Sequence, residues 1–149
     1  EDAAHWNRET ARLRDSFLAR AQRPGGGPLT FDGTGWSMKY NLLWDKVLGL
    51  GLMPESFYAA ETASYLPRIN TYGLPLDSRA DYTKSDWICW TARMADDAAV
   101  RTALIAPIAK ELRETTSRVP FSDWYDTKTG RYVAFIARSV QGGIFALML

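Results

Sequence analysis

The sequence is poor in cysteine and histidine, with one residue of each, Cys89 and His5. A single cysteine excludes an intrachain disulfide, and within the apolar run of residues 87–90 we expect a buried, unreactive thiol. The sequence offers no His–Asp pair, which argues against a Ser–His–Asp hydrolase. The sequence also lacks a cluster of metal ligands, a phosphate-binding loop and a dinucleotide fingerprint. We therefore expect neither a metal nor a cofactor.

The sequence also lacks an excess of charge of one sign and long apolar runs. Lys and Arg total 18 and Asp and Glu total 17, which leaves a net charge of +1. This balance provides no electrostatic basis for binding nucleic acid or an anionic membrane. The sequence shows no transmembrane segment and no signal peptide. Its first residues already read as helix without a start signal, so we expect the chain to be part of a longer protein.

Apolar side chains make up 46% of the 149 residues and aromatic side chains 13%, enough for one domain with a core. The rings indicate mainly packing, although some of them suit the wall of a ligand cleft. Gly130 predicts the turn of a small β-hairpin within residues 123–133. Apolar periodicity predicts helices over residues 2–21, 37–49, 54–66, 85–95, 98–116 and 140–149.

Half-polar helices alternate with nearly apolar ones along the chain, which favours a two-layer helical array. The apolar helices would expose large patches if this chain stood alone, so a missing partner segment is expected. The long loop over residues 68–84 is a candidate functional loop because connections of this length are uncommon in compact domains.

Five segments in order resemble the glutaminase A family of fungi and bacteria, and together they span most of the chain. They are residues 39–49 (KYNLLWDKVLG), 70–79 (NTYGLPLDSR), 82–87 (YTKSDW), 118–125 (RVPFSDWY) and 137–143 (ARSVQGG). The resemblance implies an all-α fold of helical hairpins. Residues 1–149 would be a single-domain fragment, about half of an (α/α)6 toroid like that of many glycosidases, with one small β-hairpin near the C-terminus.

The resemblance also implies hydrolysis of glutamine to glutamate and ammonia by an exported protein, secreted or periplasmic. The expected partners are the missing N-terminal part of the same protein and a small-molecule substrate, glutamine or a glycan. Two alternatives stay open: a glycoside hydrolase of the same fold, and a structural half of the barrel with the reacting groups elsewhere.

Asp77 and Arg79 lie in the long loop. Arg79 is suited to bind a carboxylate, and Asp77 an amine or a water molecule. A loop-fixing ion pair between the two is equally compatible with the sequence. Asp86 is a second candidate acid or base, beside Lys84. The competing interpretation is a capping box with Thr83, in which the helix dipole keeps Asp86 ionised.

Further candidates are less specific. Asp45 lies on the polar stripe of a largely apolar helix and either faces the barrel axis or water, whereas Lys46 is expected to face water. Paired carboxylates, Asp77 with Asp86 or Asp123, form the acid–base set that the sequence offers. The candidate substrate-binding residues are Arg79, Lys84, Trp36, Asp45, Asp123, Trp124 and Arg138.

Overall fold

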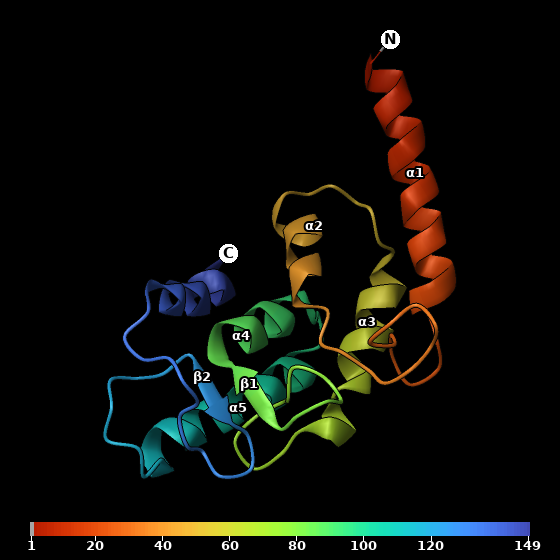
Figure 1. Cartoon of the computed structure of the whole chain (residues 1–149). Coiled ribbons are helices and arrows are strands. Elements are labelled where there is room, and N and C mark those ends of the chain that lie inside the picture. Colours follow the sequence, from red (N-terminus) through yellow and green to blue (C-terminus); the bar gives the residue numbers. More distant parts are fainter. Residues whose placement is uncertain (1) are drawn as a thin grey trace.

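Helices connected by long loops, together with one small sheet, make up the fold (Figure 1). The computed structural model describes residues 2–149. The α-helices are α1 (Asp2–Ala21), α2 (Leu43–Val47), α3 (Glu55–Ser64), α4 (Ser85–Met94) and α5 (Ala98–Glu114). Short 3-10 helices are η1 (Tyr40–Leu42), η2 (Leu66–Arg68) and η3 (Ser139–Met148), and the strands are β1 (Tyr82–Lys84) and β2 (Trp124–Asp126). Within the described residues, no helix has the length and apolar character needed to cross a membrane.

Helix α4 lies at the centre of the molecule and contributes to both hydrophobic clusters. Ile88 and Ala92 pack with Leu104 of α5 in the first cluster. Met94, at the end of α4, packs with Phe57 of α3 in the second. All five side chains are at most 2% exposed. Full burial of a large aliphatic side chain stabilises a fold by about 1.5–3 kcal/mol. Because α4 contributes buried side chains to both clusters, it connects them.

Three of the predicted helices have nearly the bounds that periodicity predicted: α1, α4 and α5. The predicted burial of α4 is confirmed, since most of its residues are buried. Helix α1 instead extends away from the other helices (Figure 1). Its apolar stripe is exposed in this chain, with Trp6 65% and Leu13 58% accessible, and only Ala21 of α1 is buried.

The predicted helix over residues 37–49 is wrong in its first turn. Residues 36–38 are extended and pair with residues 76–78 of the long loop. Met38 N–H donates to Leu76 O at 2.8 Å, and Ser78 N–H donates to Trp36 O at 3.0 Å. Only residues 40–47 are helical, as η1 and α2. The loop is therefore held by backbone pairing that periodicity does not reveal.

The predicted β-hairpin forms around its turn. Gly130 takes a positive φ of 68°, and its N–H donates to Asp126 O at 2.8 Å. The two arms are joined by hydrogen bonds from Asp126 N–H to Arg131 O at 2.9 Å and from Val133 N–H to Trp124 O at 2.8 Å. Strand β2 also pairs antiparallel with β1, with Thr83 opposite Tyr125, and this second pairing was not predicted.

The last predicted helix is present as the 3-10 helix η3, and Ser139 does not cap it. Its two central glycines lower the propensity for an α-helix. Gly143 lies directly over the first turn of α4: a Cβ atom there would be 2.8 Å from Asp86 Cβ. The absence of a side chain at Gly143 therefore allows η3 to pack closely against α4.

Candidate functional site

Asp77 and Arg79 form a bidentate ion pair in the loop between η2 and β1. Asp77 Oδ1 accepts hydrogen bonds from Arg79 N and Arg79 Nε, both at 2.9 Å, and Asp77 Oδ2 accepts from Nη2 at 2.7 Å. The Arg79 side chain is 69% exposed, whereas that of Asp77 is 11% exposed. Hydrogen bonding to Arg79 lowers the pKa of Asp77, so this carboxylate is ionised at neutral pH. A charged pair of this kind offers one cation and one anion side by side.

This pair lies between two hollows. The larger, of about 550 Å³, has an apolar wall in which Tyr40 stacks on Trp87, with ring centroids 3.9 Å apart. The smaller, of about 370 Å³, is bounded by Trp36 and by Arg68, whose guanidinium lies 4.9 Å from the Trp36 ring centroid. The larger hollow is lined by Phe17, Leu29, Ser37, Met38, Lys39, Tyr40, Asn41, Leu42, Leu76, Asp77, Arg79 and Trp87.

A second cluster forms where β1, β2 and the segment before η3 meet. Asp123, which is fully buried, accepts from Lys84 Nζ at 3.1 Å and from Arg138 Nε at 3.1 Å. Burial acts to raise the pKa of Asp123, but hydrogen bonds from Arg138 and Lys84 and their charges lower it overall. Asp123 is therefore an ionised carboxylate that two cations neutralise.

Asp86 lies next to this cluster, but the surroundings of its carboxyl group differ from those of Asp123. Its side chain is buried at 3% exposure, and within the described chain Oδ1 has no hydrogen-bond partner. Burial raises the pKa of Asp86, and the negative charge of Asp123 raises it further. The helix dipole was expected to favour the ionised form of Asp86, whereas burial acts in the opposite direction and the pKa is raised overall.

The predicted capping box is also wrong. The residue before α4 is Lys84, which makes no side-chain cap. Thr83 is in strand β1 opposite Tyr125, and its buried Oγ1 lacks a hydrogen-bond partner among the described residues. Pairing with β2 fixes Thr83 in an extended conformation, so its hydroxyl group does not reach the first turn of α4.

Aromatic rings surround the Lys84 ammonium. Its Nζ lies 4.8 Å from the Trp124 ring centroid and 5.3 Å from that of Trp87. Trp124 also stacks on Phe135, with centroids 5.3 Å apart. The fold thus brings together five of the predicted site residues: Lys84, Asp86, Asp123, Trp124 and Arg138. Burial raises the pKa of the Tyr40 hydroxyl group, and the charges of Asp86 and Asp77 raise it further. Tyr40 therefore interacts electrostatically with both regions.

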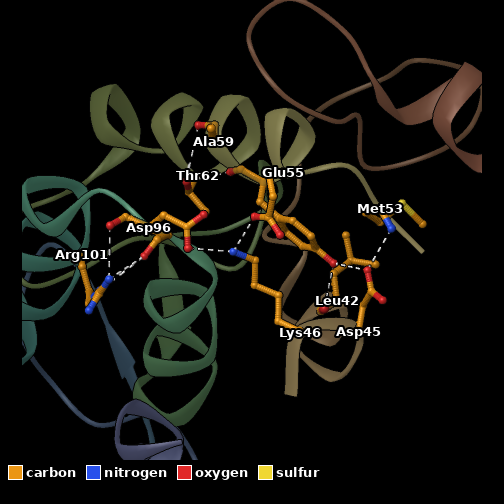
Figure 2. Close-up of polar contacts among 11 residues, drawn as sticks. Leu42, Asp45, Lys46, Met53, Glu55, Ala59, Thr62, Asp96 and Arg101 are labelled. Carbon is orange, nitrogen blue, oxygen red and sulfur yellow. Dashed lines mark hydrogen bonds and ion pairs between the residues drawn. The ribbon is translucent and has the colours of Figure 1, made fainter. Parts of the chain in front are cut away.

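Asp45 belongs to neither cluster, and its carboxylate binds the loop that follows α2 (Figure 2). Its carboxylate accepts from the N–H groups of Leu52 at 2.8 Å and Met53 at 2.9 Å, and from Tyr58 Oη at 2.6 Å. These contacts favour a structural role for Asp45. The prediction that Lys46 faces water is wrong: its side chain is 12% exposed and pairs with both Glu55 and Asp96 (Figure 2).

Two buried acids were missed by the sequence reasoning. Glu61 of α3 is 3% exposed and Glu111 of α5 is 5% exposed. Burial raises the pKa of Glu111 to about 7. In both helices the sequence pattern does not show whether the acidic side chain faces the core or the solvent. Among residues 2–149, no three His, Cys, Asp or Glu side chains are grouped so as to hold a metal ion.

Comparison with known proteins bears on the family to which the chain is similar. The sequence profile of the glutaminase A six helical-hairpin domain matches residues 18–148. Glutaminase A of Aspergillus oryzae is 43% identical over 113 residues, which are 74% of this chain and 16% of the fungal protein. A protein of Arthroderma benhamiae named "Probable glutaminase/05536" is 38% identical over 101 residues, 66% of this chain and 12% of that protein. The chain thus spans a small part of these relatives, and no solved structure matches it significantly.

Proposed function

Because this chain belongs to the glutaminase A six helical-hairpin family, we propose that it forms part of an enzyme that hydrolyses glutamine to glutamate and ammonia. The two relatives named as glutaminases support this reaction. The observation that carries it in this chain is the Asp77–Arg79 pair on the wall of the 550 Å³ hollow. The α-ammonium and α-carboxylate groups of a free amino acid are complementary to this anion and cation.

In this proposal the head group of glutamine replaces part of the Asp77–Arg79 ion pair. The α-carboxylate binds Arg79, whose planar guanidinium suits bidentate recognition, and the α-ammonium binds Asp77. The exposed Arg79 side chain is free to turn toward a ligand, while Asp77 is held by the paired backbone of residues 36–38 and 76–78. The apolar stem of glutamine then lies along the stacked rings of Tyr40 and Trp87.

Asp86 is the proton donor of the proposed reaction. Water adds to the side-chain carbonyl carbon of glutamine, the C–N bond breaks, and the leaving nitrogen takes the proton of Asp86. The proton that the water loses then returns to the Asp86 carboxylate. Two neighbouring carboxyl groups whose pKa values are shifted in opposite directions, Asp86 upward and Asp123 downward, are suited to different roles. Gly143 lies against the buried Asp86, so η3 would have to move before substrate contacts this carboxyl group.

The rest of the longer protein is the proposed partner of this chain. Helix α1 and η3 expose large apolar side chains, among them Trp6 at 65%, Phe145 at 61% and Met148 at 82%. Further hairpins of a six-hairpin toroid would bury these surfaces, and the small share of the relatives that this chain spans leaves room for them. The remaining substrate contacts would come from that part.

The test is ammonia release by the full-length protein, with glutamine and with an analogue that lacks the α-carboxylate. Arg79→Ala should raise KM for glutamine about 10- to 100-fold, because hydrogen bonds between charged groups contribute about 1.5–3 kcal/mol. KM for the analogue should stay nearly unchanged. Lys110→Ala, which removes an exposed ion pair with Glu114, is the matched control. An unmodified protein that releases no ammonia from glutamine refutes the proposal.

Glycoside hydrolysis is the second candidate, favoured by the stacked Tyr40 and Trp87 rings and by the two neighbouring carboxyl groups of Asp86 and Asp123. Aromatic faces and a carboxyl pair are the usual elements of a sugar-cleaving site. The same protein should be assayed for release of reducing sugar from oligosaccharides. Sugar release without ammonia release from glutamine would favour this candidate, and the reverse would exclude it.

A further inference from the structure

A buried carboxylate, Glu61 of α3, accepts hydrogen bonds from the loop that follows α1 and from the end of its own helix. Its Oε2 accepts from the N–H of Gly27 at 2.7 Å. Its Oε1 accepts from Tyr65 Oη at 2.8 Å. Tyr65 Oη in turn accepts from the N–H of Lys39 at 2.9 Å. Glu61 and Tyr65 are 3% and 1% exposed, so water does not substitute for these bonds.

The direction of every bond in this network is determined by its donors. The N–H groups of Lys39 and Gly27 can only donate. Because Tyr65 Oη accepts from Lys39, its own proton points to Glu61. An ionised carboxylate accepts both incoming bonds, whereas a carboxamide at position 61 would place an N–H group against one of the two donors. Burial and the negative charge of Glu61 hold the pKa of Tyr65 well above its ordinary value, which keeps this hydroxyl a donor.

The network continues to the Asp77–Arg79 pair through Lys39. The Lys39 ammonium donates to Ser37 Oγ at 2.6 Å and to Ser37 O at 2.9 Å, and also to Pro28 O at 2.9 Å. Ser37 forms an antiparallel bridge with Asp77. The extended segment of residues 36–38, on which Asp77 is held, is therefore fixed at Lys39 by both the backbone and the side chain.

Space around the network is small, so its geometry is closely determined. A Cβ atom at Gly27 would lie 2.9 Å from Lys39 Cε and 3.3 Å from Glu61 Oε1. Tyr65 also contacts Trp36, with ring centroids 6.3 Å apart, next to the smaller hollow. A displacement of Glu61 or Tyr65 would therefore also displace residues 36–39, which lie next to the Asp77–Arg79 pair.

We propose that Glu61 is a positioning residue for substrate binding: acting through Tyr65 and Lys39, it fixes residues 36–38 and thereby the place of Asp77 and Arg79. This inference rests on the proposed function for the identity of the substrate. It adds a group that does not contact substrate itself, since Glu61 is buried on the far side of Lys39. Its effect appears in binding of the amino-acid head group and not in the bond-breaking step.

The test compares Glu61→Gln and the milder Tyr65→Phe with the unmodified full-length protein. Amide hydrogen exchange measures the two bonds that join the segments, Met38 N–H to Leu76 O and Ser78 N–H to Trp36 O. Both variants should exchange these amides about tenfold faster or more, because each leaves a buried donor unpaired. KM for glutamine should rise about tenfold while kcat stays within about twofold, the pattern of lost uniform binding.

Lys46→Met is the control for stability loss alone. It removes a largely buried cation that pairs with Glu55 and Asp96 next to the same helix α3 (Figure 2). Lys46 is not among the residues that line either hollow. This variant should lower the unfolding temperature without faster exchange at residues 38 and 78 and without a change in KM.

Unchanged exchange at residues 38 and 78 in both Glu61→Gln and Tyr65→Phe would overturn the inference, as would faster exchange in Lys46→Met to the same extent. If exchange increases as expected but the unmodified protein releases no ammonia, the positioning role stands and the proposed function fails. If exchange increases and ammonia is released with KM unchanged, the role in substrate binding is refuted. The two failures are therefore distinguishable.

Discussion

Replacing Gly143 by alanine provides a sharp test of how η3 packs on α4. A Cβ atom at this position would lie 2.8 Å from Asp86 Cβ and 3.0 Å from Trp90 Nε1, against 3.4–4 Å for an ordinary contact. The η3 segment therefore has to move away from α4. That movement also threatens the hydrogen bond from Trp90 Nε1 to Gly143 O, now 3.0 Å. Overpacking of this kind costs about 1–3 kcal/mol, and an unpaired indole N–H about as much again.

Gly142 is the matched control, because an added Cβ atom there meets no atom within 4 Å and its φ is not in the left-handed region. Gly142→Ala should be neutral or stabilise the fold by up to about 1 kcal/mol, since alanine loses less backbone entropy on folding. Gly143→Ala should lower the free energy of unfolding by about 1–4 kcal/mol relative to Gly142→Ala. Urea denaturation of both variants of the full-length protein, followed by tryptophan fluorescence, measures the difference. Equal stability of the two variants would refute the packing of η3 on Asp86.

Two further predictions concern buried acids. Burial raises the pKa of Glu111 from its ordinary 4.5 to about 7. The folded chain therefore binds a proton that the unfolded chain releases, and the free energy of unfolding falls by about 3 kcal/mol as the pH rises through this range. Glu111→Gln should abolish that fall in urea denaturation at about pH 5 and about pH 8; an unaltered pH dependence would contradict the assignment. Asp86→Asn should reduce kcat for ammonia release by on the order of 10²–10⁴ and remove the alkaline limb of the pH–rate profile, whereas full activity would exclude Asp86 as proton donor.

The strongly periodic helices were predictable because their signal is local. In α4 and α5, apolar residues recur with helical spacing over several turns, and the turn at Gly130 is likewise a short-range feature. Errors occurred where a distant segment competes. Residues 36–38 read as the start of a helix, but they pair with residues 76–78, and Thr83 reads as a helix cap although it is paired with Tyr125.

The candidate residues could be named from the sequence, but the way the fold groups them could not. Asp77 and Arg79 are two positions apart, so the sequence already suggested that they could pair, and they do. Lys84 and Asp123 are 39 positions apart, and Arg138 is a further 15 residues on. The pairing of β1 with β2 brings Lys84 to Asp123, and the packing of η3 on α4 places Arg138 beside them. Glu61 was overlooked because its network joins the end of α3, at Tyr65, to Gly27 and Lys39 in the connection between α1 and η1, which is distant in the sequence.

The sequence by itself determined the family and most of the helices, because five motifs and apolar periodicity are properties of neighbouring residues. The direction in which the pKa of the buried Asp86 and Asp123 is shifted was decided by the tertiary structure. Asp86 and Asp123 are both buried aspartates, yet the pKa of Asp86 is raised and that of Asp123 lowered. The difference lies in their partners: Asp123 is bound by Lys84 and Arg138, while Asp86 Oδ1 has no partner in the described chain. Burial opposes ionisation unless a fixed opposite charge offsets it, and that charge is supplied by residues distant in the sequence.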